Sequence, residues 1–107
     1  KFDNQEFDFG SISGKTPVEH SFRLINEGKS DLLIRKVTAS CGCTAVQPAK
    51  TLISPGDTAM IKVKFNPSGR EGNQKKAVTV ITNDPRRSKS ILWIKAEIQR
   101  ASGNTNP

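Results

Sequence analysis

The sequence predicts an all-β protein, a seven-stranded antiparallel β-sandwich of immunoglobulin-like type. Apolar and polar residues alternate with a period of two along most of the 107-residue chain, which is the pattern of strands that bury one face. Clusters of Gly, Pro, Asn and Asp interrupt that pattern at short intervals, and no segment shows the period of a helix. An open barrel is the alternative arrangement for so many short strands.

Seven segments carry the alternating pattern. They are residues 7–12, 18–26, 32–40, 45–48, 58–66, 75–83 and 88–99. The first is brief and breaks at Ser13 and Gly14. The second alternates most cleanly, since His20 and Phe22 point to one side and Glu19 to the other.

The third segment changes its parity partway. Leu32 and Ile34 have even numbers, whereas Val37 and Ala39 have odd numbers, so a regular strand cannot bury both pairs. We therefore expect a β-bulge near residues 35–36, which would turn both pairs toward the core.

The later segments have clear boundaries. The segment 45–48 ends at Pro48, which favours a sheet edge because proline lacks a backbone N–H. Pro55 and Gly56 predict a type II turn, since proline presets the second position and glycine supplies the positive φ of the third. The last segment, 88–99, is the longest.

In five of the strands, apolar residues occupy every second position and therefore lie on one face, which predicts the hydrophobic core. The expected core residues are Phe22, Leu24, Ile34, Val37, Ile61, Val63, Phe65, Val78, Val80, Leu92, Ile94 and Ala96. We expect residues 1–100 to form a single immunoglobulin-like domain and the small polar residues 101–107 to form a disordered tail. No apolar run approaches the roughly 20 residues that cross a bilayer as a helix, and the chain start has no signal-peptide pattern.

The charge balance is basic, with 17 Lys and Arg against 10 Asp and Glu and a net charge of +7. Such a balance attracts anionic glycans, anionic lipid surfaces and nucleic acid. The basic residues alternate with apolar ones, as Lys62 and Lys64 do with Val63, which is typical of solvated faces and protected edges. Nucleic acid is disfavoured because sheets that bind it also expose aromatic residues, and Tyr is absent.

Cys41 and Cys43, with Gly42 between them, are the residues that point most specifically to a chemical role. Two thiolates at this spacing could hold Cu or take part in a Zn site, for which His20 is the one imidazole in the sequence. A redox pair is a second possibility if Gly42 permits a turn, because side chains at i and i+2 of an extended strand lie too far apart for a disulfide. The third is structural, as two small buried residues or an incidental disulfide.

A catalytic site is not expected. His20 shares the face of Phe22 and Leu24, which favours a hydrogen-bonded residue of the core or its rim. The acidic residues are scattered over chain ends and turns, where they fit capping and turn roles. No cofactor is expected apart from the metal alternative at the cysteines.

Trp93 and Ile91 form the candidate partner surface. Their parity is opposite to that of Leu92 and Ile94, so we expect them on the outer face of their sheet. Exposed apolar patches often mark surfaces that bind partners. The alternative is that Lys or Arg stems cover the indole ring within the monomer.

Several segments in this order resemble domain of unknown function 1573, a bacterial secreted family with immunoglobulin-like sandwiches, and more distantly hydin-type domains and major sperm protein. The segments are residues 7–10, 18–26, 33–34, 37, 40–44, 54–57, 63–65, 69 and 80–85. The resemblance covers about residues 7–98, and its specific part is the stretch from Ser40 to Thr44. It implies an exported, often lipid-anchored bacterial protein, in the periplasm or at the cell surface, with no assigned activity and no catalytic residues.

The expected function is a non-enzymatic binding or scaffolding module of an exported bacterial protein. It would act through protein–protein contacts, at a sheet edge or around Trp93, with a protein partner or a neighbouring domain of the parent chain. The alternatives are a soft-metal-binding or thiol-redox protein that uses Cys41 and Cys43, and a polyanion-binding domain. The partner's identity and the oligomeric state stay open at this point.

Overall fold

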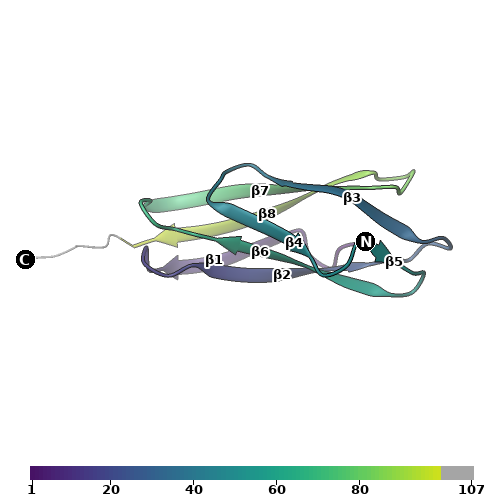
Figure 1. The fold of residues 1–107 in the computed structure, drawn as a ribbon. Coiled ribbons are helices and arrows are strands. Elements are labelled where there is room, and N and C mark those ends of the chain that lie inside the picture. The colour runs from purple at the N-terminus through teal and green to yellow at the C-terminus, as the bar shows by residue number, and fades with distance from the viewer. Residues whose placement is uncertain (100–107) are drawn as a thin grey trace, which may run out of the picture.

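The computed structural model describes residues 1–99 and contains strands but no helix in that range. Two β-sheets pack face to face around one hydrophobic core (Figure 1). The strands are β1 (Glu6–Ile12), β2 (Val18–Ile25), β3 (Leu32–Ala39), β4 (Thr44–Pro48), β5 (Leu52–Ile53), β6 (Thr58–Phe65), β7 (Gly72–Thr82) and β8 (Lys89–Ile98). The predicted tail, residues 101–107, lies outside the described residues.

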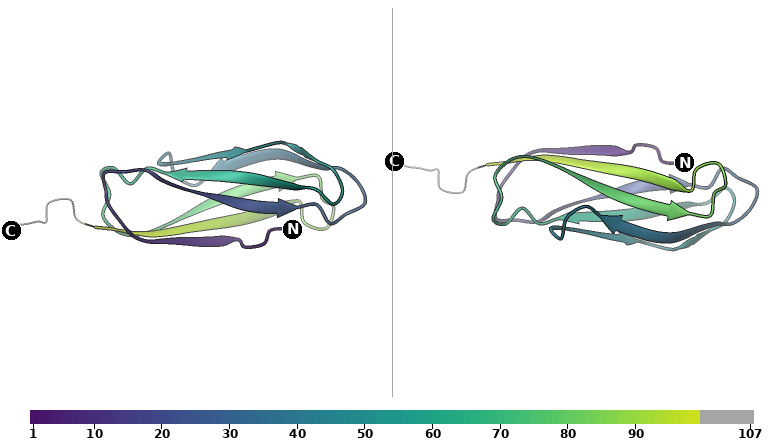
Figure 2. Two further views of the ribbon diagram at one scale, coloured as in Figure 1. Left: turned by 90° about the horizontal axis from the view of Figure 1, so that it is seen from below. Right: turned by 90° about the horizontal axis from the view of Figure 1, so that it is seen from above.

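The larger sheet has the strand order β1-β8-β7-β3-β5, and the smaller one has the order β2-β6-β4. The two layers are seen from opposite sides in Figure 2. In the smaller sheet, β2 and β6 pair without interruption from Val18 opposite Phe65 to Ile25 opposite Thr58. The all-β sandwich predicted from the sequence is therefore confirmed.

Two details differ from the prediction. The described chain has eight strands instead of seven, because β5, with two residues, is too short to show a period; it pairs with Leu32 and Leu33 of β3. The sheets are also not wholly antiparallel, since β1 runs parallel to β8 with Glu6 opposite Trp93. Alternation tells which side chains share a face and carries no information on strand direction.

The predicted bulge in β3 is confirmed. Ile34 lies opposite Thr82 while Lys36 lies opposite Ile81, so the register with β7 shifts between these two residues of β3. As a result Ile34 is buried and Val37 also packs against the core.

The core lies between the sheets. Eleven of the twelve expected residues are buried, and Val37 is the exception because it is only partly buried. The buried apolar residues that the expected set omits are Leu32, Ile53, Ala59 and Ile98. The type II turn is also formed, with Gly56 at a φ of 81° and the N–H of Asp57 donating to the carbonyl of Ser54 at 3.0 Å.

Candidate functional site

The connection from β3 to β4 crosses from one sheet to the other and contains both cysteines. Cys41 and Cys43 form a disulfide, with their Cα atoms 5.2 Å apart. The chain turns at this point, since the N–H of Thr44 donates to the carbonyl of Cys41 at 3.1 Å. The exposed Gly42 lies at the turn. This turn explains how two side chains two residues apart come into bonding distance.

The two sulfur atoms have different surroundings. The Sγ of Cys41 accepts a hydrogen bond from the N–H of Cys43 at 3.0 Å and one from Nη2 of Arg70 at 3.5 Å. Cys43 packs against the core, and its sulfur lies 3.7 Å from the hydroxyl oxygen of Thr44. The positive charge and the two donors are therefore directed at Cys41.

Residues 1–99 contain no group of three or more His, Cys, Asp and Glu placed to hold a metal ion. His20 is the single histidine of the sequence, and it lies in an aromatic cluster between the sheets. Its ring stacks on Phe7 with 3.7 Å between centroids and meets Phe22 edge-on at 4.8 Å. Burial lowers the pKa of His20 below its ordinary value of about 6.5. The neutral form is therefore favoured in the folded protein.

Ile91 and Trp93 lie on the outer face of the five-stranded sheet, and both are half-buried. Lys75 of the neighbouring strand places its Nζ 4.7 Å from the centroid of the Trp93 ring. Lys75 therefore lies over the indole ring within the monomer. Lys95 is instead engaged in an ion pair with Glu6 at 2.6 Å.

The smaller sheet has an edge strand, β2, that the sequence did not single out. Its C-terminal half is covered by the first residues of the chain. The N–H of Asp3 donates to the carbonyl of Arg23 at 3.2 Å, and the N–H of Ile25 donates to the carbonyl of Lys1 at 2.7 Å. In Figure 2 the N-terminus lies beside the end of β2.

The N-terminal half of this edge is open. Because backbone groups alternate along a strand, Ser21 and Glu19 direct their N–H and C=O to the same side as Arg23 and Ile25. Within the described range, no turn, loop or side-chain hydrogen bond reaches these groups of Ser21 and Glu19. On the outer face, Ser21 lies opposite Lys62 of β6, so the open edge adjoins a basic side chain.

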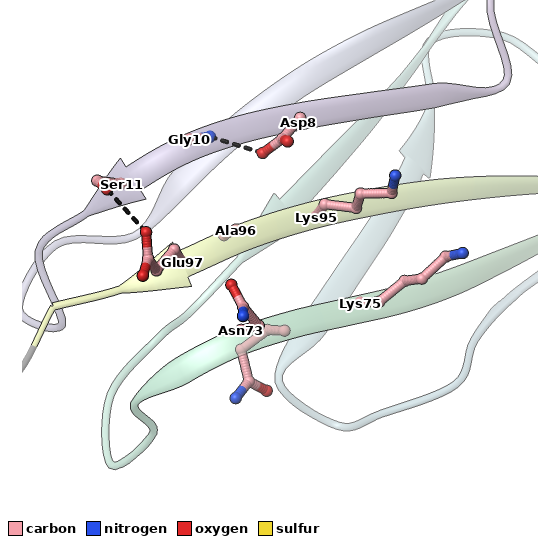
Figure 3. Close-up of a pocket in the computed structure, with 9 residues that line it drawn as sticks. Asp8, Gly10, Ser11, Asn73, Lys75, Lys95, Ala96 and Glu97 are labelled. Atoms are coloured by element: carbon pink, nitrogen blue, oxygen red, sulfur yellow. Dashed lines mark hydrogen bonds between the residues drawn. The ribbon is translucent and has the colours of Figure 1, made fainter.

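A shallow polar hollow of about 380 Å³ lies on the outer face of the five-stranded sheet (Figure 3). It forms where the β1–β8 register shifts between Asp8 and Ser11, with Gly10 at a φ of 73°. The hydroxyl of Ser11 donates to Glu97 at 3.2 Å, and the N–H of Gly10 donates to Asp8 at 2.8 Å. Lysines and carboxylates both line the hollow, so its charges largely compensate one another.

A family model matches residues 1–98 of this sequence, that of the proteins of unknown function called DUF1573. The chain belongs to this family. The resemblance seen in the sequence is thereby confirmed. No curated protein matches the chain at a significant level. Residues 1–99 contain no helix long and apolar enough to cross a membrane.

Among solved structures, a Porphyromonas gingivalis W83 protein of unknown function is 22% identical, with a TM-score of 0.80 over 87% of this chain and 44% of its own. The Vibrio cholerae VesB protease is 15% identical, with a TM-score of 0.75 over 91% of this chain and 31% of its own. The PapD-like domain 7 of human CEP192 is 12% identical, with a TM-score of 0.70 over 95% of this chain and 86% of its own.

The Pseudomonas aeruginosa CupB2 chaperone is 13% identical, with a TM-score of 0.67 over 92% of this chain and 55% of its own. The YadV chaperone is 15% identical, with a TM-score of 0.67 over 97% of this chain and 54% of its own. At these identities the likeness shows the fold alone. The chain spans less than half the length of the first two structures named above.

Proposed function

We propose that this domain is a non-catalytic protein-binding module that takes an extended segment of a partner protein onto the open half of the β2 edge. The observation that carries this proposal is the pairing of residues 1–3 with the other half of the same edge. The edge therefore already accepts an extended segment through backbone hydrogen bonds. Addition of a strand to an exposed sheet edge is a general mode of peptide recognition.

The side chains beside the open edge indicate the chemistry of the partner. Ser21 and Glu19 lie opposite Lys62 and Lys64, whose exposed side chains point to the outer face of the smaller sheet. A partner segment with an acidic residue on that face would meet Lys62 across the small Ser21 side chain. Backbone bonds would supply affinity, and the charge pairing would set the register.

The comparisons agree with this role at the level of the fold. Two of the solved structures that share the sandwich are named chaperones, and another is a PapD-like domain. We place the module outside the cytoplasm, as the resemblance of its sequence to this family of exported proteins implies. The partner is a separate protein or a neighbouring domain of a longer parent chain.

The experiment places a photo-crosslinking amino acid at position 21 and, as a control, at position 79 on the outer face of the other sheet. The partner that crosslinks from position 21 is identified by mass spectrometry and its affinity is then measured. Ser21→Pro removes the outward N–H and should lower the affinity at least tenfold, whereas Ser21→Thr should retain it.

The variant Trp93→Ala distinguishes binding at the β2 edge from binding at the other candidate surface, around Ile91 and Trp93. If Trp93→Ala abolishes binding while Ser21→Pro leaves it unchanged, the partner covers the outer face around Ile91 and Trp93, and the β2 edge is not the binding site.

A further inference from the structure

The Cys41–Cys43 disulfide has features that a structural crosslink does not need. It closes a loop of only three residues, so it ties together parts of the chain that are already adjacent. It lies in a surface connection, where Cys41 is half-buried and Gly42 is exposed. A disulfide that is accessible and closes so small a loop belongs to the readily reduced class.

The surroundings of the pair are also asymmetric. Nη2 of Arg70 lies 3.5 Å from the sulfur of Cys41, and the N–H of Cys43 donates to the same sulfur at 3.0 Å. A guanidinium and a backbone donor both favour the thiolate over the thiol. Cys43 packs against apolar core residues, which favours the neutral thiol.

We propose that Cys41 and Cys43 form a reactive dithiol–disulfide pair that exchanges with protein disulfides, with Cys41 as the attacking sulfur and Arg70 as its positioning residue. This function is separate from strand addition at β2 and does not depend on it.

The exchange balances without a metal or a cofactor. In the reduced protein, the Cys41 thiolate attacks one sulfur of a partner's disulfide, a Cys41–partner bond forms, and the partner's other sulfur leaves as a thiolate. Cys43 then loses its proton to water and attacks the sulfur of Cys41. The disulfide seen in the structure is restored, and the partner leaves with both sulfurs reduced. A dithiol protein of the same compartment returns the pair to the reduced state by the reverse steps.

The test uses the single variants Cys43→Ser and Cys41→Ser, each with one thiol left, and oxidised glutathione as the probe. Circular dichroism first establishes that both variants are folded. The mixed disulfide with glutathione, followed by intact mass, should form several-fold faster at neutral pH on Cys43→Ser than on Cys41→Ser. Equal rates for the two variants would overturn the assignment of Cys41 as the attacking sulfur.

The effect of Arg70 on the Cys41 thiol is tested by measuring how the rate of alkylation of this thiol depends on pH. In Cys43→Ser the midpoint for reaction with iodoacetamide should lie below the ordinary thiol pKa of about 8.5. Adding Arg70→Gln should move the midpoint back toward that value, and Arg70→Lys should move it less. A midpoint that Arg70→Gln leaves unchanged would remove Arg70 from the proposal.

The wild-type pair provides a third readout that needs no variant. Its disulfide should open in millimolar glutathione, which structural disulfides resist. A pair that stays oxidised under those conditions would show a structural crosslink, and the exchange proposal would fail.

Discussion

Asn26 shows how single polar residues hold the sandwich together. Its side chain is buried, and its amide donates to the carbonyls of Ser30 and Ile53, both at 2.8 Å. Its side-chain oxygen accepts the N–H of Gly28 at 2.9 Å. A buried polar group is tolerated only when it is hydrogen-bonded in this way. One residue at the end of β2 therefore fixes both the following loop and the short strand β5.

Phe65 is expected to be among the most costly core residues to truncate. Its side chain is 1% exposed, and Phe65→Ala should lower the free energy of unfolding by about 3–5 kcal/mol, because it removes buried apolar surface and leaves a cavity. Met60 on the same strand is 42% exposed, so Met60→Ala serves as the matched control. Urea denaturation of both variants checks the difference; a similar small loss in both would contradict the phasing of β6.

His20 should make stability depend on pH. Its folded-state pKa is lowered by burial, so as pH falls through about 6.5 the unfolded chain binds a proton that the folded chain does not. The free energy of unfolding therefore declines below that pH until the folded-state pKa is reached. Urea midpoints measured from about pH 7.5 down to about pH 5 should fall more steeply for the wild type than for His20→Phe. Parallel profiles for the two proteins would contradict this.

At the scale of elements, alternation located most strands because each buries one face against the other sheet. The bulge in β3 was predictable for the same reason, since only an extra residue brings Ile34 and Val37 to one side. The two-residue β5 and the parallel pairing of β1 left no periodic signal. The sequence also placed Ile91 and Trp93 on the outer face without showing that Lys75 covers the ring.

The turn before β6 should depend on its glycine. Gly56 has a φ of 81°, and a Cβ added there would meet open space, so Gly56→Ala tests backbone strain alone. The expected loss is about 1 kcal/mol. Gly42 has equally open surroundings and no positive φ, so Gly42→Ala should change stability little. Thermal unfolding of both variants measures the contrast, and equal midpoints would rule out strain at Gly56.

At the scale of the whole molecule, the contacts that the sequence could not reveal are those between distant segments. Arg70 reaches the sulfur of Cys41 across 29 positions of sequence, and no spacing rule connects them. The cover that residues 1–3 provide for β2 is also a tertiary feature. The sequence shows the two cysteines. It does not show that Arg70 lies beside Cys41, because the folded sheets bring these two residues together.

The sandwich should stay folded without its disulfide. The crosslink closes a loop of three residues, for which chain entropy predicts only about 2 kcal/mol of stabilisation. The double variant Cys41→Ser and Cys43→Ser should therefore show a native circular dichroism spectrum and a thermal midpoint lowered by roughly 5–15 °C. A double variant that is unfolded at room temperature would mean that the crosslink holds the two sheets together.

The parallel pairing of β1 with β8 gives the domain a mechanical property. Glu6 and Ile12 at the ends of β1 lie opposite Trp93 and Ile98, so the two strands run side by side in the same direction. A pull on the chain before β1 against a pull on the chain after β8 acts along these strands in opposite senses. The hydrogen bonds between β1 and β8 then resist in shear and share the load, instead of opening one at a time as in a zipper. The pairing of β1 with β8 should therefore withstand a larger pulling force than two strands loaded so that they unzip.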